Sequence, residues 1–421
     1  MDAQIITMII LIIAIVLFIT EWISPASTAL FVSLSLYASG ILSAGEVLSG
    51  LTNSAVILTA GMFILGGVLL SCGFTAVLGE KIIKYIKGER NIMAVLMITG
   101  VIMSAFLSGI GTITILTPLA VGICQSNKEY KLSRLLIPCF IACTTGGMIT
   151  LIGKPANMAA RDLLLKSGLG TLGFFEFAKI GIPVSAVLIV FMYFWGYRML
   201  PDTGADADKL SASCHFRDMK KSEKYYALIV FIIVIIAMTL ESIINVPSHM
   251  SALFGVLLMY IGGVLKKDKD TYSYIGWTTL FVLGGMLPLA AAMDKTGLAE
   301  TTASLIVSVI GENSSPVFVN ALFCISLGIL TEFMSNTVVC TIFVPIGIAV
   351  AERLGISPVS LAMTITIASG CAFAIPFGAP FAAYVMEYGN YKTKHYIKVG
   401  IPLNLISWAV SIISVSLFWA F

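Results

Sequence analysis

The sequence predicts an all-α polytopic membrane protein made of two inverted repeats. Three observations support this fold class: the composition, the uneven distribution of Lys and Arg along the chain, and short motifs that recur in the same order in both halves. Of 421 residues, 58% are hydrophobic and only 11% are charged, and the mean hydropathy is +1.00, whereas soluble domains carry about 25% charged residues. This composition excludes a soluble enzyme, and the net charge of +3 is too small to indicate nucleic acid as a partner. We therefore expect the protein to be embedded in membrane lipid.

Apolar runs long enough to cross a bilayer follow one another along the chain, since a span needs roughly 20 apolar residues. The first run has no basic residue before it, which favours a retained span over a secretory signal. We expect crossings at 5–20, 26–43, 54–78, 134–166, 178–200, 224–245, 248–265, 275–293, 358–388 and 396–420. Two further segments, 91–124 and 316–352, are interrupted by small and polar residues, so that each is either two spans or one re-entrant hairpin.

The positions of Lys and Arg decide between these two readings. If both segments are re-entrant hairpins, nineteen of the 25 basic residues fall on one side of the membrane. The opposite side receives five, namely Arg161, Lys166, Lys179, Lys295 and Arg353, and Lys154 lies inside a span. By the positive-inside rule the side with nineteen is cytoplasmic. We therefore expect an integral protein of the inner (plasma) membrane with both termini outside the cytoplasm.

Four short motifs recur in the same order in both halves of the chain. The matching pairs are 63–67 with 281–285, 107–118 with 334–345, 153–155 with 378–380, and 179–183 with 398–402. Each half contains five crossings, an odd number, so the second repeat must be inverted relative to the first. Inverted repeats whose interrupted helices meet at the membrane midplane are typical of secondary transporters.

The interruptions carry the expected chemistry. Gly153-Lys154-Pro155 and Gly378-Ala379-Pro380 each break a span near its middle, because proline removes a backbone donor and glycine permits non-helical dihedrals. Broken helices persist in a membrane only where their free backbone groups line a cavity or bind a ligand. The hairpin tips, 108–110 and 335–337, are expected to face these breaks, with the positive end of a half-helix suited to an anion.

At these motifs the sequence resembles the divalent anion/sodium symporter family, of the ion transporter superfamily. Residues 331–337 read Thr-Glu-Phe-Met-Ser-Asn-Thr, like the family's second hairpin, and residues 150–157 read Thr-Leu-Ile-Gly-Lys-Pro-Ala-Asn, like its first break. The resemblance extends from about residue 54 to the end. It implies a homodimeric elevator-type transporter for dicarboxylates, citrate or sulfate, coupled to sodium in most members and working by exchange in one branch.

The resemblance also implies a division into scaffold and transport elements. The scaffold would comprise residues 1–90 in the first repeat and 224–300 in the second. The transport elements would be 91–200 and 301–421, each with a hairpin, a broken helix and a final helix, and 201–223 would be a cytoplasmic connector.

Site residues follow from the same resemblance, motif by motif. The second repeat would contact substrate through Ser335, Asn336 and Thr337, with Ala379 and Pro380 behind them. The first repeat would use Ser108, Gly109, Lys154 and Pro155. A coupling cation, sodium, would bind near Thr331, Asn336 and Gly378, and a first cation site would use Ser104, Ser108 and Gly153. No other cofactor is expected.

The chain departs from the family pattern at three places. The first hairpin reads Ser108-Gly109-Ile110 where the family has Ser-Asn-Thr, Lys154 replaces a Thr, and the second break lacks the usual Pro-Asn continuation. These departures weaken the first sodium site and half of the carboxylate clamp. We therefore expect exchange of small divalent anions, di- or tricarboxylates before sulfate, or transport with reduced sodium coupling. The alternatives are a sodium symporter that uses the second cation site, and an anion channel.

An enzyme is not expected. No Asp lies in the middle of an apolar run, and no Ser and His share a midplane position, as intramembrane proteases would require. A channel would need a continuous polar stripe, whereas the polar groups here cluster at one depth. Glu332 lies one turn before the second tip, where it either braces the hairpin or carries a proton.

Overall fold

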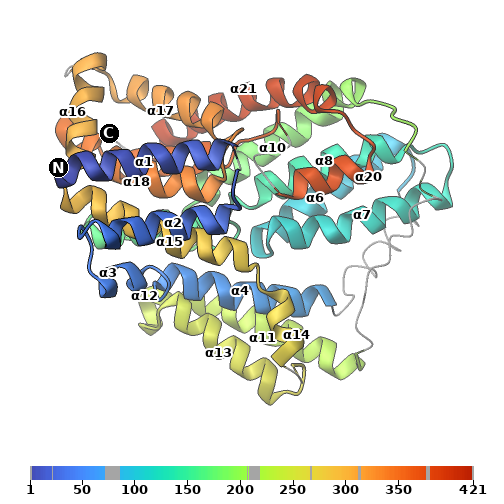
Figure 1. Ribbon diagram of the computed structural model, residues 1–421. Coiled ribbons are helices and arrows are strands. Elements are labelled where there is room, and N and C mark those ends of the chain that lie inside the picture. The colour runs from blue at the N-terminus through green and yellow to red at the C-terminus, as the bar shows by residue number, and fades with distance from the viewer. Residues whose placement is uncertain are drawn as a thin grey trace.

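The computed structural model describes residues 2–20, 22–71, 86–205, 207, 219–265, 268–311, 314–375 and 380–419. In these ranges the chain is helical throughout and has no strands, and the helices lie side by side in one bundle (Figure 1). Eight of the described helices are long and apolar enough to cross a membrane, and seven more are apolar but shorter. The predicted fold class, an all-α multi-pass membrane protein, is confirmed.

The first repeat supplies the helices up to residue 199. They are α1 (Ala3–Thr20), α2 (Pro25–Ala38), α3 (Ala44–Ser49), α4 (Ser54–Ser71), α6 (Glu89–Phe106), α7 (Gly109–Ser126), α8 (Leu132–Gly146), α9 (Pro155–Lys166), α10 (Ala178–Phe194) and the 3-10 turn η1 (Gly196–Met199). Serine caps and prolines fix several of the starts: Ser24 accepts a hydrogen bond from the Ser27 amide, and Pro25 occupies the first turn of α2.

The second repeat supplies the remaining helices. They are α11 (Lys221–Thr239), α12 (Glu241–Ile244), α13 (Ser248–Ile261), α14 (Asp268–Tyr274), α15 (Trp277–Lys295), α16 (Leu298–Ile310), α17 (Pro316–Leu330), α18 (Asn336–Leu354), α19 (Pro358–Ser369), α20 (Pro380–Tyr388) and α21 (Thr393–Phe418). The cap-and-proline start recurs at α17 and α19, through Ser315 with Pro316 and Ser357 with Pro358.

Both interrupted segments fold as re-entrant hairpins. Helices α6 and α7 form hairpin 1, whose two ends meet at its base, where the Lys131 amide lies 2.5 Å from Oε1 of Glu89 and the Gly88 amide donates to Tyr130. Helices α17 and α18 form hairpin 2, and its base lies beside α19, where the Thr364 hydroxyl donates to Asn320 at 2.6 Å. Figure 1 shows the two hairpins entering from opposite ends of the bundle.

The two repeats pack on each other reciprocally. Helix α2 of the first repeat packs on α15 of the second, and its counterpart α13 packs on α4; in the same way α9 packs on α18, and α20 on α7. Such paired contacts are what a two-fold relation between repeats produces. Close approach depends on small residues, because a Cβ atom at Gly285 would lie 2.8 Å from the Ala29 carbonyl oxygen, and one at Gly61 would lie 2.8 Å from the Ala252 side chain.

Each repeat contains one broken helix. The first break, residues 147–154, separates α8 from α9, and the second break, residues 370–379, separates α19 from α20; residues 376–379 lie outside the described chain. Gly181 of α10 lies against the first break, and Gly400 of α21 lies against the second, since a Cβ at either glycine would approach Met148 or Phe373 backbone atoms within 2.4 Å. Helices α10 and α21 also pack on each other.

Charged side chains gather at the two ends of the bundle. At one end Arg134 pairs with Glu89 at 3.4 Å. At the other end Arg161 pairs with Glu241 at 2.7 Å, and Lys295 pairs with Glu46 at 2.9 Å. Both chain termini lie at this second end in Figure 1. The assignment of this end to the outside of the membrane stays a prediction from the positive-inside rule.

A polar cluster at this second end joins the C-terminal half of α9 to the helices beside it, and we name it the end cluster. Besides the ion pair of Arg161 with Glu241, it contains Asp162, which accepts hydrogen bonds from Asn53 at 2.8 Å and from Ser54 at 3.1 Å. Ser248 donates to Glu241 at 2.6 Å. The end cluster therefore connects α9 to α4, α12 and α13.

Short helices α3, α14 and α16 were absent from the predicted spans. The predicted boundary after residue 300 falls inside α16, which packs on α18 and α15. This helix begins after Gly297, whose φ of 70° lies in the left-handed region that glycine tolerates. The polar residues 294–297 end the preceding span, and α16 has only 13 residues, fewer than a crossing needs, so a span prediction passes over it.

Candidate functional site

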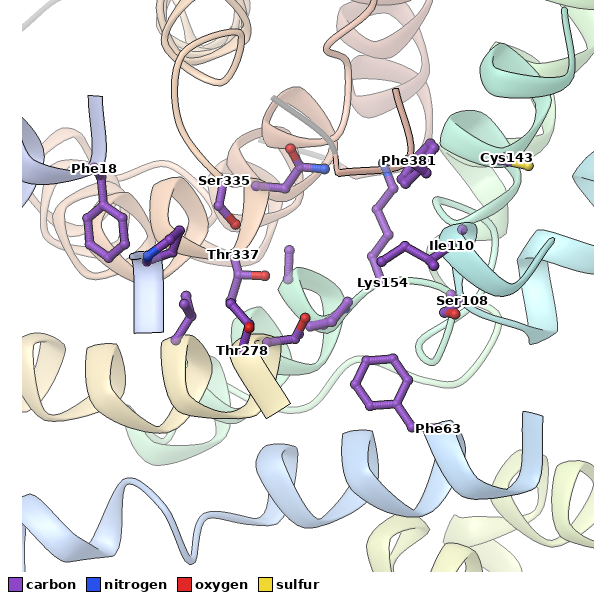
Figure 2. Close-up of a pocket in the computed structure, with 18 residues that line it drawn as sticks. Phe18, Phe63, Ser108, Ile110, Cys143, Lys154, Thr278, Ser335, Thr337 and Phe381 are labelled. Carbon is purple, nitrogen blue, oxygen red and sulfur yellow. The ribbon is translucent and has the colours of Figure 1, made fainter. Parts of the chain in front are cut away.

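A cavity of about 200 Å³ lies between the hairpin tips. The predicted substrate residues that line it come from both tips and the first break, namely Ser108, Gly109, Lys154, Pro155, Ser335, Asn336 and Thr337. Figure 2 shows Ser335 and Thr337 on one side of the cavity and Ser108 and Ile110 on the other. The predicted residues Gly378 and Ala379 lie outside the described chain, and of Pro380 only the backbone is described.

The tip of hairpin 2 is the polar wall of the cavity. Ser335 precedes the first turn of α18, and no side chain caps the free amides of this turn. The N-terminus of α9 is uncapped in the same way, after Lys154. Uncapped helix N-termini direct N–H groups and a partial positive charge at whatever lies before them, which favours an anion. Asn336 and Thr337 add an amide and a hydroxyl donor to this wall.

The tip of hairpin 1 is different. The Ser108 hydroxyl accepts a hydrogen bond from the Gly111 amide at 3.1 Å, so its oxygen caps α7. Ile110 is 48% exposed and presents an apolar side chain to the cavity. Gly109 lies against the ring of Phe381, since a Cβ atom there would lie 2.9 Å from its Cε1 atom. This tip therefore offers little to a charged ligand.

Lys154 lies at the first break and is 9% exposed. Its ammonium group donates a hydrogen bond of 3.0 Å to the carbonyl oxygen of Gly370 in the second break. Close packing places it there, because a Cβ at Gly147 would lie 2.9 Å from the Lys154 stem and one at Gly370 would lie 2.7 Å from its ammonium nitrogen. Within the described chain, no carboxylate lies within ion-pair distance of this ammonium group.

The first break is held in shape by hydrogen bonds from two polar side chains. Asn157 of α9 donates to the carbonyl oxygens of Gly147 at 3.0 Å and Thr150 at 2.8 Å. The Thr150 hydroxyl donates to the Ala105 carbonyl of hairpin 1. The hairpin, the break and the half-helix are thereby fixed to one another.

The predicted cation ligands form two separate groups. Thr331 is buried, and its hydroxyl oxygen lies 2.7 Å from the Ser369 carbonyl and 3.0 Å from Oδ1 of Asn336. Ser104 is also buried and donates to the Cys143 carbonyl at 2.6 Å. Oxygen atoms are the ligands that hard cations prefer, and the Thr331 group brings three together. Neither Ser104 nor Thr331 lines the cavity.

Glu332 connects hairpin 2 to the second break. Its Oε1 atom accepts hydrogen bonds from the amides of Phe373 at 3.0 Å and Ala374 at 3.1 Å, and from Asn404 at 2.6 Å. Its Oε2 atom accepts from the Ile375 amide at 2.6 Å. This geometry fits the bracing role better than proton carriage, because both carboxylate oxygens already accept hydrogen bonds from donors of the second break and α21.

Several lining residues were not predicted. Phe63 of α4 and Thr278 of α15 border the cavity, as do Phe18 and Phe381 (Figure 2). Helices α4 and α15 contain one of the recurring motifs, 63–67 with 281–285, so the repeat pattern was a usable signal for Phe63. The ends of α1 and α20 had no comparable signal.

Comparison with known proteins agrees with this architecture. A sequence model of the citrate transporter family (CitMHS) matches residues 15–337 and 242–421, which together cover nearly the whole chain. The chain belongs to this family. Its members are membrane transporters rather than enzymes, and the resemblance to divalent anion/sodium symporters is confirmed.

The individual relatives of this chain within and around the citrate transporter family are distant in sequence. It is 27% identical to an uncharacterized transporter of Methanocaldococcus jannaschii, covering 78% of this chain and 74% of the relative. It is 25% identical to the sodium-dependent dicarboxylate transporter SdcS of Staphylococcus saprophyticus, over 94% of this chain and 82% of the relative. The YdaH transporter of Alcanivorax borkumensis has a similar structure, with a TM-score of 0.66 at 14% identity over 96% of this chain and 98% of that one.

Proposed function

We propose that this protein is a secondary active transporter of small carboxylate anions, which bind in the cavity between the hairpin tips. The observation that carries the proposal is the convergence of two uncapped helix N-termini, those of α18 and α9, with the donors of Asn336 and Thr337 at one cavity. Di- and tricarboxylates are the first substrates to test, and sulfate is the inorganic alternative. The name of SdcS, a dicarboxylate transporter, supports this order.

The coupling we propose is exchange of anions, or transport with reduced sodium dependence. The fixed positive charge of Lys154 beside the second break takes part of the electrostatic role that a bound sodium would have. A covalently attached charge cannot leave after each cycle, so an empty carrier retains an uncompensated cation in its moving part. Return of the empty carrier is then costly, whereas return with an anion bound is not, and this asymmetry favours exchange.

The second candidate is sodium symport through the second cation site. The geometry around Thr331 favours it, because the Asn336 side-chain oxygen and the Ser369 carbonyl oxygen each lie within 3.0 Å of the Thr331 hydroxyl oxygen. The first site is less favourable, because Ser104 and Ser108 bond to the backbone of Cys143 and Gly111, whereas Thr331 of the second site also bonds to Asn336, another predicted ligand of that site. One sodium ion at the second site is compatible with Lys154 at the first break.

The movement we propose is an elevator stroke of a homodimer, carried over from the family resemblance. The transport part comprises both hairpins, both broken helices, α10 and α21, and the scaffold comprises α2, α4, α11, α13 and α15. Extensive packing within the first set, including α6 on α8, α18 on α19 and α10 on α21, supports treating it as one block.

The test is uptake into proteoliposomes of dicarboxylates, citrate, sulfate and phosphate, with and without a sodium gradient and with or without internal anion. Saturable uptake that internal anion accelerates would support the exchanger. Uptake that follows the sodium gradient in vesicles without internal anion would support the symporter. Linear, unsaturating flux with large single-channel currents would indicate an anion channel and contradict the proposal.

A further inference from the structure

The scaffold side of the cavity carries two polar side chains that the proposed function does not use. Helices α1, α2, α4 and α15 contribute the lining residues Phe18, Pro25, Phe63, Thr278, Thr279 and Val282. Of these, only Thr278 and Thr279 have side chains that can donate a hydrogen bond. None of the described residues that line the cavity is acidic. The two threonines of α15 are therefore the polar part of an otherwise apolar wall.

Helix α15 begins at this wall, and the start of the helix is uncapped. Its first residue is Trp277, and no side chain caps its first turn after Gly276. The amides of Trp277 and Leu280 donate to backbone carbonyl groups. The amides of Thr278 and Thr279, which lie between them, have no acceptor among the described residues. The start of this 19-residue helix thus adds free N–H groups and a partial positive charge to the wall.

The position of this helix start differs between the two repeats. The motif that pairs 63–67 with 281–285 places Ala60 and Gly61 of α4 opposite the two threonines. Helix α4 is continuous through both positions, whereas α15 begins there. Free amides inside a membrane persist where they line a cavity or bind a ligand. The repeat pattern alone does not account for the start of α15, whereas an anion in the cavity does.

A hydroxyl group of hairpin 2 borders the same part of the cavity. Thr337 of α18 is 5% exposed and lines the cavity, and its hydroxyl has no hydrogen-bond partner among the described residues. Figure 2 shows Ser335, Thr337 and Thr278 following one another along one side of the cavity, with Lys154 facing them. Helices α15 and α18 also pack on each other. A largely buried hydroxyl gains from an acceptor, and an anionic oxygen in the cavity would supply one.

These donors come from two parts of the protein that move relative to each other in the proposed elevator stroke. Helix α18 belongs to hairpin 2 and so to the transport part. Helix α15 packs on α2 and α4 and belongs to the scaffold. A stroke carries the tip of hairpin 2 past the start of α15. One anion can therefore contact both helices at only one end of the stroke.

We propose that Thr278 and Thr279 are anion-binding residues of the scaffold. They hold an oxyanion group of the substrate together with Asn336 and Thr337 at the end of the stroke that this structure shows. At the other end the anion keeps only the donors of the transport part and is bound more weakly. This inference rests on the proposed function and deepens it, because it makes the affinity of the same cavity depend on the position of the elevator.

The test measures affinity separately on the two faces of the membrane. Right-side-out and inside-out membrane vesicles that contain the full-length protein present the two ends of the stroke to added succinate or citrate. The double substitution Thr278→Val with Thr279→Val removes both hydroxyls and keeps the shape of the side chains. We expect the half-saturating concentration for counterflow to rise about tenfold or more on one face and to stay unchanged on the other. No change on either face, or an equal rise on both, would overturn the inference.

Matched variants separate hydrogen bonding from packing. Thr278→Ser with Thr279→Ser keeps both hydroxyls and should retain the wild-type half-saturating concentration on both faces. A rise with the serine pair as large as that with the valine pair would show that packing is responsible, and the inference would be wrong. Thr296→Val makes the same chemical change at the other end of α15, outside the cavity, and should have no effect on either face.

Single substitutions keep the inference testable if the valine pair does not fold, with the melting temperature as the check. At least one of Thr278→Val and Thr279→Val should raise the half-saturating concentration several-fold on one face only. Two folded single variants with wild-type values on both faces would overturn the inference.

Failure of this inference is distinguishable from failure of the proposed function. If succinate, citrate and sulfate all show no saturable uptake by the wild-type protein, the proposed function is wrong. Asn336→Ala changes the transport part and should raise the half-saturating concentration on both faces. If it does so while the valine pair leaves both faces unchanged, only the scaffold contribution is wrong.

Discussion

The ammonium group of Lys154 donates a hydrogen bond to the carbonyl oxygen of Gly370, 216 residues away along the chain. Gly370 follows the last turn of α19, where backbone carbonyl groups lack helical partners and carry a partial negative charge. One side chain thereby connects the first break to the second. A lysine inside a membrane costs at least about 2.5–3.5 kcal/mol on insertion scales, and this carbonyl partner offsets part of that cost.

Replacing Lys154 should change the coupling. We expect Lys154→Thr to raise net uptake relative to anion counterflow, because the substitution removes the fixed charge that disfavours return of the empty carrier. Lys179→Met is the control, since Lys179 is an exposed lysine paired with Glu176 outside the cavity. Concentrative uptake driven only by sodium in vesicles without internal anion, and unaffected by Lys154→Thr, would contradict the exchange mechanism.

Asn336→Ala should weaken anion binding. Loss of one well-placed donor to a charged oxygen costs roughly 1.5–3 kcal/mol, or about ten- to a hundredfold in affinity. The measurement is the concentration dependence of uptake, with melting temperature as the check on folding. Asn91→Ala makes the same chemical change at an exposed residue near the base of hairpin 1 and should leave the affinity as it is. Unchanged affinity in a folded Asn336→Ala protein would sink the placement of the anion.

Glu332→Ala should destabilise the protein. It leaves the amides of Ala374 and Ile375 without their acceptor, and a buried donor that loses its partner costs about 1–3 kcal/mol. We expect a clear fall in melting temperature in detergent, which Glu300→Ala, a change at an exposed residue, should not produce.

Glu332→Gln separates bracing from proton carriage. If Glu332 only braces the hairpin, uptake by the Glu332→Gln protein should respond to an imposed pH gradient in the same way as uptake by the wild type. Should wild-type uptake follow the pH gradient and the folded Glu332→Gln protein lose that response, Glu332 would be a proton carrier instead.

The end cluster should affect the rate of transport rather than the affinity for anion. Arg161 and Asp162 of α9 bind Glu241, Asn53 and Ser54 on the proposed scaffold, and none of the five lines the cavity. If α9 moves past these helices, breaking a partly buried ion pair worth about 1 kcal/mol changes the rate several-fold.

A double-mutant cycle of Arg161→Ala and Glu241→Ala measures this coupling, with the maximal rate and the half-saturating concentration determined separately. We expect non-additive effects on the rate and an unchanged half-saturating concentration. Additive effects, or a change confined to affinity, would show that the end cluster does not control the movement.

Sequence reasoning predicted the spans, both hairpins and both breaks because each has a local physical cause. Length and hydropathy identify spans, Lys and Arg sort the loops, and Gly153 and Pro155 mark a break whatever surrounds them. Helix α3 could not be predicted in this way, since its six residues are too few to stand out from the apolar runs beside it. Helix α16 was left out of the predicted spans because its 13 residues are fewer than a crossing needs.

Site residues that are consecutive in the sequence could be predicted, whereas contacts between residues of different repeats could not. Ser335, Asn336 and Thr337, which line the cavity, could be picked out because they are consecutive and resemble the second hairpin motif of the divalent anion/sodium symporters. Phe381 was passed over because its role depends on lying beside Gly109, a contact between residues of different repeats. The Gly370 partner of Lys154 escaped prediction for the same reason, because a backbone carbonyl has no sequence signature.

Gly181 of α10 lies against the first break and Gly400 of α21 lies against the second, and α10 and α21 pack on each other. The fixed charge of Lys154 and the bound anion would therefore cross the membrane electric field together, and the charge moved would be their net charge. With a monovalent anion that sum is zero, so the loaded stroke would ignore the membrane voltage, while the empty stroke would carry one positive charge, worth about 2.3 kcal/mol per 100 mV. A divalent anion would reverse the sign of the loaded stroke. The voltage dependence of transport would therefore report the charge of the transported anion.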